Sequence, residues 1–565
     1  MATDHSLENG FFLGTYRVQP GLRLVGGPEG EVRLEPKAME VLLALAGSDG
    51  ATVSREKLIE QVWPRGHVTD DVLNRCIGQI RKALGESPRD ARFLNTIPKQ
   101  GYRLDGVRRS ADLSVDEMPG LLVLPFQSLS PSPEDAYLAD GLTELLIAKL
   151  ASVRSLRLIS RTSAMALGRS EDTLPAIARR VDARWVVEGS VLISGDQIQV
   201  VAQLIDADTD AHVWADTYQS KLSGLLSLQN AVARRIAAKV QGRLLPRVSQ
   251  DDLSSDALRA YLRALTLKSH RTAPELREAR GLLEQLTTSQ AEFAPAWGLL
   301  GIVYRLLTHY GFEPASDLLP LARQCGERAL KLDPDQPSGL VCVGAIRLLS
   351  DRDAEGAEPL IRRALEIQPN HDLALINMAN ICSIRRRFDE SRNWCRAALR
   401  SDPLNVGVHM NYGDHLILGG AYEDAAEQMR HALDLQPDHL PCRLRLAWAL
   451  ALGGRYPEAL ELVGQLVEEH PGASAVSEYA AMVYGLTGNS GKSIRQSHAL
   501  RQASGYVSPW SLARAAAGAG QIGDAFGFLE RAFAQNSSSL PFLEVTPAFR
   551  SLHDDSRWPR LRARL

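Results

Sequence analysis

The sequence TDDVLNRCIGQIRKAL at residues 69–84 decides how the N-terminal part of this chain folds. At 3.6 residues per turn its apolar side chains fall on one side of a helix, and they are Val72, Leu73, Ile77, Ile80 and Leu84. The other faces carry Asn74, Arg75, Gly78, Gln79, Arg81 and Lys82. Thr69 or Asp70 is placed to cap this helix, and Gly85 is placed to end it. The stretch therefore predicts a helix with a buried back and a polar, basic front.

A second segment, FLNTIPKQGYRL at residues 93–104, predicts a β-hairpin with a basic tip. Positive charge is concentrated in the predicted helix and hairpin. Residues 75–109 contain nine Lys and Arg residues and three acidic residues, whereas the net charge of the whole chain is −3. A helix that presents Asn and Arg beside a basic hairpin suits base reading in the major groove with phosphate contacts. These residues alone leave another interpretation open, which is an exposed helix of an ordinary domain.

The sequence upstream of the helix favours the first interpretation. Strand-like runs at 12–18 and 31–34 precede LEPKAMEVLLAL, a helix with Pro36 in its first turn, and VSREKLIEQVW, a helix that Ser54 would cap. Together with the basic helix and NTIPKQGYRL, this order resembles the winged-helix DNA-binding domain of the OmpR and PhoB type over residues 11–106.

The resemblance implies a recognition helix at 69–84, a wing at 91–104 and a set of DNA-binding residues. That set is Asn74, Arg75, Gly78, Gln79, Arg81, Lys82, Thr96, Lys99, Gln100 and Arg103. The first four would face the major groove, the next two would reach the backbone or the groove edge, and the remainder belong to the wing. Pro98 stands where the family often has an Arg, so a minor-groove contact would depend on Lys99. Gly78 removes a side chain from the groove face, which leaves Arg75 and Asn74 as the expected base readers.

The length of 565 residues and the ordinary content of 45% hydrophobic residues indicate a soluble chain of three or four domains. The N-terminus lacks the pattern of a secretion signal, and no apolar run approaches the roughly 18–20 residues of a membrane helix. Some regulators with this kind of winged helix carry a membrane span directly after it, whereas VRRSADLSVDEMP at 107–119 is polar. We expect a cytoplasmic protein without membrane contact, with a winged-helix domain at 8–108 and a linker at 109–118.

The six cysteines form no C-x-x-C pair and no regular spacing. This pattern predicts reduced, mostly buried thiols. Cys76 lies on the predicted recognition helix, where a redox switch is the alternative to simple packing.

The middle segment alternates between strand and helix patterns. Strands are predicted at 121–126 and 156–159 and as a pair within 185–203, with helices at 135–153, 175–181 and 222–244. The motifs LLVLPFQSLS, YLADGLTELLIAKL and WVVEGSVLISGDQIQVV resemble the TolB-like or FlgO-like module, so we expect a compact α/β domain at 119–246. Its candidate ligand residues are Arg161, Ser163, Gly189 and Ser190, although turn and packing roles are favoured for them.

From residue 256 the chain repeats itself. Prolines at 334, 369, 403, 437 and 471 are separated by 35, 34, 34 and 34 residues, and each follows a helix of the type RALKLDP or HALDLQP. A 34-residue period is typical of tetratricopeptide repeats, whose opening motif is present as Trp297, Leu300, Gly301 and Tyr304. The spacing from Tyr304 to Ala322 exceeds the standard by nine residues, which predicts lengthened helices or an inserted loop. About eight repeats are expected at 256–546, followed by a capping segment at 547–565.

Stacked repeats form a superhelix whose concave groove binds proteins or peptides. The alternative is that the array only dimerises the molecule or covers the middle domain.

No segment predicts catalysis, a cofactor or a metal site. GLTGNSGKS at 485–493 looks like a phosphate-binding loop, but Leu486 stands where that motif needs Gly. The H-E-x-x-H and G-x-S-x-G motifs are absent from the sequence. The chain is therefore not expected to be an enzyme.

The expected fold is multidomain, α+β followed by all-α: a winged helix, a central α/β domain and a tetratricopeptide superhelix. This order resembles that of the HilA-like activators. Our hypothesis is a one-component bacterial transcription regulator whose repeats sense a protein, a peptide or a small ligand. The candidate partners are double-stranded DNA, RNA polymerase, an unidentified protein or peptide in the groove, and a second copy on DNA. The rival hypothesis is a repeat-based adaptor whose winged helix contacts protein.

Overall fold

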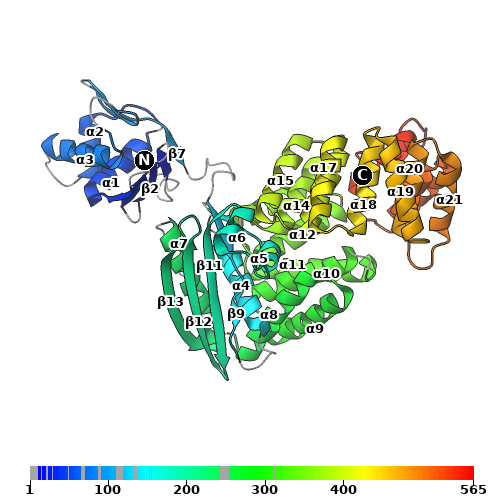
Figure 1. The fold of residues 1–565 in the computed structure, drawn as a ribbon, viewed down its shortest axis with the longest axis horizontal. Helices are drawn as coiled ribbons and strands as arrows, with labels where there is room; N and C mark the ends of the chain where they lie inside the picture. The colour runs from blue at the N-terminus through cyan, green and yellow to red at the C-terminus, as the bar shows by residue number, and fades with distance from the viewer. Residues whose placement is uncertain are drawn as a thin grey trace. The chain divides into compact units, whose positions relative to one another are not determined.

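The computed structural model divides into two compact units. The first unit comprises Met1–Leu122, Ala148–Arg157 and Thr173–Gln250, and the second comprises Val123–Ile147, Leu158–Asp172 and Asp251–Leu565 (Figure 1). The residues that the structure describes are 11–13, 16–20, 23–27, 30–48, 50–64, 70–86, 91–98, 100–109, 119–130, 136–151, 153, 156–241, 253–309 and 312–565.

The chain begins with an antiparallel sheet whose strand order is β4-β3-β2-β1-β7. Its strands are β1 (Phe11–Leu13), β2 (Tyr16–Gln19), β3 (Leu24–Gly27), β4 (Gly30–Arg33) and β7 (Val107–Arg109). The single strand predicted at 12–18 is wrong, because β1 and β2 pair with each other and Leu13 lies opposite Tyr16. In the sequence, Gly14 lies between the two strands, and glycine is a residue type that favours turns.

Three helices and a hairpin complete this N-terminal domain: α1 (Pro36–Ala46), α2 (Arg55–Val62), α3 (Asp70–Ala83), β5 (Leu94–Ile97) and β6 (Gly101–Leu104). The predicted cap of α2 is confirmed, since the Ser54 hydroxyl accepts a hydrogen bond from the backbone N–H of Lys57 at 3.2 Å. The predicted stop after α3 is also confirmed, because Gly85 has the left-handed φ of 60°. Thr69 lies outside the described residues. The domain has its own hydrophobic core, which is built from residues between Phe11 and Leu104.

One member of the predicted apolar stripe of α3 is wrong. Leu73, Ile77, Ile80 and Leu84 are buried as expected, but the side chain of Val72 is exposed and Cys76 is buried instead. The buried positions 73, 76, 77, 80 and 84 follow the i, i+3, i+4, i+7 spacing, and position 72 falls outside this stripe.

The central sheet has the strand order β10-β8-β11-β12-β13. The elements of this region are β8 (Gly120–Val123), β9 (Gln127–Ser128), α4 (Ala136–Leu150), β10 (Arg157–Leu158), α5 (Arg161–Leu167), α6 (Leu174–Arg180), β11 (Ala183–Ser194), β12 (Gln197–Asp206), β13 (Ala211–Lys221) and α7 (Leu225–Gln241). The predicted strand pair is confirmed as β11 and β12, with Gly195 at φ 61° in the turn. Strand β13 was not predicted, because it lies at the edge of the sheet and most of its side chains are exposed.

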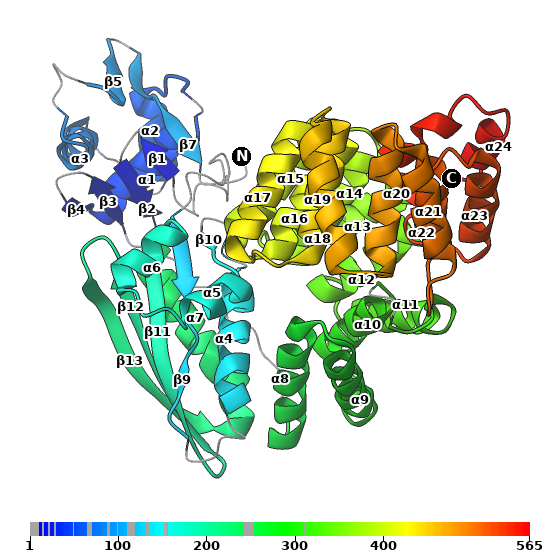
Figure 2. The ribbon, with the colours of Figure 1, turned by 45° about the vertical axis from the view of Figure 1, so that its right-hand side comes forward.

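Eight consecutive pairs of contacting helices follow, which confirms the repeat array (Figures 1 and 2). They are α8 (Ser255–His270) with α9 (Ala273–Ser289), α10 (Ala294–His309) with α11 (Ala315–Leu332), α12 (Pro337–Leu349) with α13 (Ala354–Ile367), α14 (Asp372–Ile384) with α15 (Phe388–Ser401), α16 (Val406–Leu418) with α17 (Tyr422–Leu435), α18 (Leu440–Leu452) with α19 (Tyr456–Glu469), α20 (Ser474–Leu486) with α21 (Ser490–Arg501), and α22 (Pro509–Gly518) with α23 (Ile522–Ala534). The first helix of each pair corresponds to the one that carries the Trp297 motif. Because α10 and α11 have 16 and 18 residues, whereas α12 and α13 have 13 and 14, the nine-residue excess lies in lengthened helices and in the loop between them.

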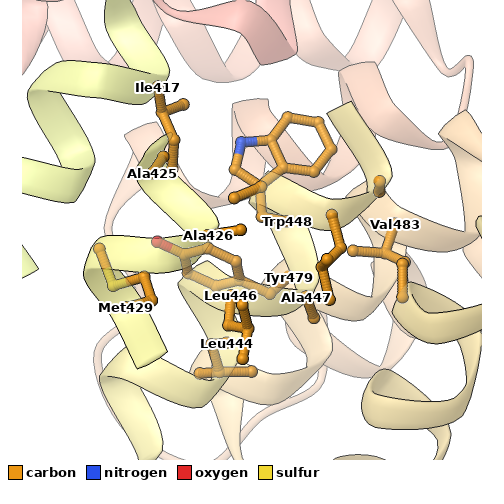
Figure 3. Packing of buried hydrophobic residues seen from close by; sticks show 14 of the residues in the cluster. Ile417, Ala425, Ala426, Met429, Leu444, Leu446, Ala447, Trp448, Tyr479 and Val483 are labelled. Carbon is orange, nitrogen blue, oxygen red and sulfur yellow. The ribbon is translucent and has the colours of Figure 1, made fainter. Parts of the chain in front are cut away.

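Small and aromatic side chains alternate in the core of the array. Around Trp448 and Tyr479, the residues Ala425, Ala426 and Leu444 are buried in one cluster (Figure 3). Alanine at the contact lets neighbouring helices approach, and the rings fill the space that remains.

The last residues of the sequence pack against the last helix pair. Its elements are η6 (Leu540–Phe542), η7 (Pro547–Leu552) and α24 (Trp558–Arg562). Phe549 and Trp558 join the cluster of α22 and α23, and the ring centroids of Trp510 and Phe549 are 5.0 Å apart. The terminal arginines accordingly belong to a packed segment rather than to a separate basic tail.

Two of the candidate ligand residues in the middle segment make structural contacts within the second unit. Asp402 accepts hydrogen bonds at its Oδ1 from the backbone N–H of Ser163 at 3.1 Å and from the Ser163 hydroxyl at 2.7 Å. Arg161 lies 3.5 Å from Glu144 and donates to the Ser269 hydroxyl. Gly189 and Ser190 lie within β11 and pair with β12. The packing roles therefore hold for Arg161 and Ser163, and strand pairing holds for Gly189 and Ser190.

All six cysteines are free and buried, as predicted. At Cys76, burial and the nearby carboxylate of Glu35 raise the pKa of the thiol, which leaves little reactive thiolate. Among the described residues, no helix combines the length and the apolar character that crossing a bilayer requires.

Candidate nucleic-acid interface

The exposed face of α3 is the centre of the candidate interface. Asp71, Arg75, Gly78 and Lys82 are exposed and follow the spacing i, i+4, i+7 and i+11, so they form one line along the helix. Leu73, Ile77 and Ile80, on the opposite side, are buried in the core. The core therefore fixes the orientation of the helix and leaves this line of residues, the reading line, open to a ligand.

Arg75 is the main cationic group in the N-terminal half of the reading line. Its side chain is 73% exposed, and its Nη2 lies 3.2 Å from Oε1 of Glu35, which is itself 56% exposed. An ion pair between two such exposed groups contributes only about 0–1 kcal/mol. Arg75 can thus leave Glu35 at little cost and extend toward a base.

Asn74 is held beside the wing rather than left free. Its Oδ1 accepts hydrogen bonds from Nη1 of Arg55 at 3.1 Å and from the hydroxyl of Tyr102 at 3.0 Å. Arg55 also lies over the ring of Tyr102, 5.0 Å from its centroid. Bidentate recognition of adenine needs this same oxygen as an acceptor. Asn74 is therefore well placed to fix the angle between α3 and the wing, and its oxygen can accept from adenine only after at least one of these bonds is broken.

The expected DNA contact of Arg81 requires a correction. Arg81 is only 9% exposed, and its Nη2 donates to the carbonyl oxygen of Leu94 at 3.2 Å and to the hydroxyl of Thr96 at 2.8 Å. Residue 81 falls on the side of α3 that packs against β5, so the guanidinium ties the helix to the hairpin. Arg81 is accordingly a structural residue, and Thr96 is its partner.

The wing consists of β5 and β6, which pair antiparallel with Thr96 opposite Tyr102. Gln100 is exposed in the turn, and its backbone N–H bonds to the carbonyl oxygen of Ile97 at 3.1 Å. Arg103 donates from Nε to Asp105 at 3.0 Å, so its charge is balanced locally. Lys99 lies outside the described residues.

Of the remaining predicted residues, Gln79 is half-buried at the flank of the reading line, and Lys82 is exposed near its C-terminal end. Sequence reasoning missed two exposed neighbours of Arg75, namely Asp71 and Val72. Carboxylates accept from the cytosine amino group, and apolar side chains contact the thymine methyl group. The exposure of Val72 could have been predicted from its position, because an i, i+3, i+4 stripe that passes through Leu73 leaves Val72 on the exposed side of the helix.

Sequence reasoning also missed Glu86, which holds the start of the wing. This residue is 9% exposed, and its carboxylate accepts from the backbone N–H groups of Arg92 at 2.8 Å, Phe93 at 2.6 Å and Leu94 at 3.2 Å. Three consecutive N–H groups on one carboxylate fix the entry of β5 directly after the recognition helix.

We expect Glu86→Ala to lower the free energy of unfolding of the N-terminal domain by about 1–3 kcal/mol, because three backbone donors lose their acceptor. Glu86→Gln keeps one acceptor oxygen and should lose about half as much. Denaturant unfolding of residues 1–110, followed by the fluorescence of Trp63, measures both changes. Equal stability of the Ala variant and the native sequence would contradict the role assigned to Glu86.

Gly78 leaves open space in the middle of the reading line. A Cβ atom built at this position meets nothing within 4 Å. A glycine inside a helix costs about 0.5–1 kcal/mol relative to alanine, and no packing within the domain requires it here. The gap is consistent with close approach of the helix to the floor of a groove.

Gly78→Ala should therefore raise the unfolding free energy by about 0.5–1 kcal/mol while weakening binding to DNA. Chemical denaturation and a binding titration on the same protein test the two halves of this statement. Higher stability with unchanged affinity would show that DNA does not approach the helix at residue 78.

The described residues hold no group of three or more His, Cys, Asp or Glu side chains suited to a metal ion. The glycine-rich stretch at 485–493 lies at the junction of α20 and α21, where Lys492 stacks on the ring of Tyr484 and Ser493 is buried. A phosphate-binding loop would instead follow a strand and present its backbone N–H groups.

Comparison with known families matches three segments of the chain. Residues 29–104 match the family described as "Transcriptional regulatory protein, C terminal". Residues 385–439 and 416–482 match tetratricopeptide repeat families. The first match covers α1, α2, α3 and both strands of the wing.

Three curated proteins illustrate the similarity. A putative adenylate cyclase 3 of Rhizobium meliloti is 30% identical over 231 residues, which are 39% of this chain and 39% of that protein. The transcriptional regulator HilA of Salmonella paratyphi A is 21% identical over 447 residues, which are 78% of this chain and 73% of HilA. The transcriptional activator CadC of Escherichia coli is 32% identical over 93 residues, or 16% of this chain and 18% of CadC. The alignment thus spans well under half of the cyclase and about three quarters of HilA.

Among solved structures, the DNA-binding domain of E. coli CadC aligns with 18% of this chain and 95% of its own length, at 30% identity and a TM-score of 0.17.

Proposed function

We propose that this chain, which carries a winged-helix domain of the transcriptional regulatory C-terminal family and an array of tetratricopeptide repeats, is a one-component transcription regulator that reads DNA with α3. The observation that carries the proposal is the reading line: Arg75, Gly78 and Lys82 are exposed together on a helix whose other side is fixed in the core. Such a helix fits the major groove, and residues near its N-terminus reach base edges.

The residues of the reading line have different roles in this proposal. Arg75 donates to a base, guanine being the partner best matched to its two donors. Lys82 lies about two turns further along α3 and contacts a phosphate. Asn74 positions the helix against the wing through Tyr102, and Gln100 at the tip of the wing lies against the backbone.

Lys82→Ala should weaken binding to all DNA sequences alike and reduce the slope of log K against log salt by about one unit, because one phosphate contact is lost. Fluorescence anisotropy titrations at four salt concentrations, on cognate and on random DNA, measure this slope. A loss restricted to the cognate sequence would assign base reading to Lys82.

The proposed assembly on DNA contains two copies of the chain. One winged helix makes few base contacts, so useful specificity follows when two subunits bind half-sites separated by a multiple of a helical turn. The proposed partners of this assembly are RNA polymerase and a protein or peptide bound by the repeats. Analytical ultracentrifugation of the protein with a two-site DNA should give a complex of two chains per duplex, whereas one chain per duplex would contradict the assembly.

The second candidate is a repeat-based adaptor whose winged helix binds protein. It is favoured by the reduced positive charge of this surface, since Arg103 of the wing is neutralised by Asp105 and Arg81 of α3 is buried. Salt dependence separates the candidates: DNA binding by a regulator falls steeply between 50 and 200 mM salt, on the order of 10³-fold for six phosphate contacts. Absent or salt-independent binding to DNA would support the adaptor.

A further inference from the structure

The repeat array lines an open cavity of about 320 Å³ between its second and third helix pairs and the loops that flank its last pair. One wall comes from α10, α11 and α12, and the opposite wall comes from the loop before α22 and from residues 535–539 after α23. In both ribbon views the orange segment between α21 and α22 reaches toward α10 and α11 (Figures 1 and 2). Segments about two hundred residues apart in the sequence thus share one site.

The irregular repeat builds this cavity. Thr308 and His309 lie in the last turn of the lengthened α10, and Ala315 and Leu319 lie in the first turns of the lengthened α11. With the lengths of α12 and α13, which are 13 and 14 residues, the first helix would end before Thr308 and the second would begin after Ala315. The nine-residue excess therefore serves to form a wall of the cavity.

Specific contacts hold the opposite wall in place. Nη1 of Arg352 donates to Oδ1 of Asn536 at 2.7 Å, which connects the turn after α12 with the loop after α23. The hydroxyl of Tyr506 donates to Oε1 of Gln535 at 3.1 Å and joins the two loops of this wall. The cavity is thus a built feature of the array and not an incidental gap between helices.

The two walls of the cavity differ in polarity. Ala345 and Ile346 are buried and, with Leu349, give an apolar patch, whereas Ser537, Ser538 and Ser539 give hydroxyl groups on the other side. Arg305 is 8% exposed and brings a permanent positive charge to the same cavity. None of the seventeen described residues that line the cavity is acidic.

We propose that this cavity binds a small organic acid, whose carboxylate lies at Arg305 and the serine hydroxyls and whose short apolar body lies on Ile346 and Leu349. Carboxylates are the groups that a guanidinium fork and hydroxyl donors match best. The volume falls in the range of about 300–1,000 Å³ that is typical of small-molecule sites. A ligand here would contact the second and third helix pairs and the loops that flank the last pair, so its occupancy would alter the curvature of the repeats between them. This proposal gives the sensor role of the array a specific class of ligand. Only the effect of binding on regulation rests on the proposed function.

Thermal unfolding and isothermal titration of the full-length chain with sodium octanoate test the site, with 1-octanol and octylammonium as probes of equal length. Octanoate at ten times its Kd should raise the unfolding midpoint by about 2–4 °C. 1-Octanol should bind at least about tenfold more weakly, because it makes no charge-assisted bond, and octylammonium should not bind. Equal binding of the three probes, or no binding of octanoate, overturns the proposal.

Two variants place the effect at the cavity. Arg305→Gln removes the charge and should weaken octanoate at least about tenfold. Ser538→Trp fills the mouth from an exposed loop position, where it leaves folding intact, and should abolish binding. Ser490→Trp is the control, because it changes an exposed serine that does not line the cavity, and this variant should bind octanoate as the native chain does.

Octanoate binding that persists in Ser538→Trp overturns the proposal, and this holds even if Arg305→Gln fails to fold. The assay contains no DNA, so its failure is distinguishable from failure of DNA recognition.

Discussion

Arg75→Ala is expected to lower the affinity for cognate DNA by about 1–3 kcal/mol and to abolish preference at one base pair of each half-site, because a bidentate guanidinium contact is lost. Binding to random DNA should fall far less, since a phosphate contact is not the main loss. The fold should be unaffected, because the side chain is 73% exposed and its only ionic partner in the described structure is exposed Glu35. Titration of cognate and random duplexes with the native and variant proteins gives both numbers.

Glu35→Gln is the matched control for this change. Glu35 occupies the N-cap position of α1 without making a side-chain cap bond, so its neutralisation should leave the helix intact. The variant releases Arg75 and removes a negative charge from the DNA-facing side, and its affinity should rise by up to about 1 kcal/mol. Equal losses on cognate and random DNA in Arg75→Ala would show that Arg75 contacts phosphate and that another residue reads the base.

Gly101→Ala is expected to destabilise the N-terminal domain by about 3–5 kcal/mol, the largest stability effect that we predict. Gly101 has a φ of 138°, and a Cβ atom at this position would lie 2.0 Å from the carbonyl oxygen of Val53. That oxygen accepts from the N–H of Tyr102 at 3.0 Å, and the N–H of Val53 donates to Tyr102 at 2.8 Å. The new methyl group would separate these strands and detach the wing from the residues before α2.

Gly50→Ala separates the steric effect from the backbone effect. Gly50 also has a positive φ, 78°, but a Cβ atom there would meet only Asp105 at 4.0 Å. This variant should lose only the left-handed penalty of about 1–2 kcal/mol. Denaturant titration of residues 1–110 compares the two, with Trp63 as the sole tryptophan in that segment. Equal losses in both variants would contradict the clash at Gly101.

Periodicity made the repeats and the main helices predictable. The 34-residue spacing of the prolines predicts about eight helix pairs, and eight are present in the described part of the array. The same arithmetic located the irregular repeat between Tyr304 and Ala322, although it could not show that distant loops would close a cavity over it. That closure depends on the curvature of the whole superhelix, which no local pattern encodes.

The candidate interface was less predictable, because polar side chains on a helix can face a ligand, a neighbouring strand or solvent. Sequence spacing places Arg81 among the polar faces, and only the position of β5 shows that it is buried against Leu94 and Thr96. No sequence pattern predicts the role of Glu86, because the three backbone N–H groups that it accepts from belong to residues six to eight positions later. Val72 was assigned to the core by its hydrophobicity, whereas its angular position on α3 leaves it exposed.

Selection of genomic fragments by the full-length protein, at two salt concentrations and in parallel with Arg75→Ala, tests the central claim that the reading line of α3 recognises a DNA sequence. We expect the native chain to enrich fragments that share a repeated motif, and the Arg75→Ala variant to lose the preference at one base of each half-site at both salt concentrations. The claim would be contradicted if the native chain enriches no common motif, or if both proteins enrich the same complete motif.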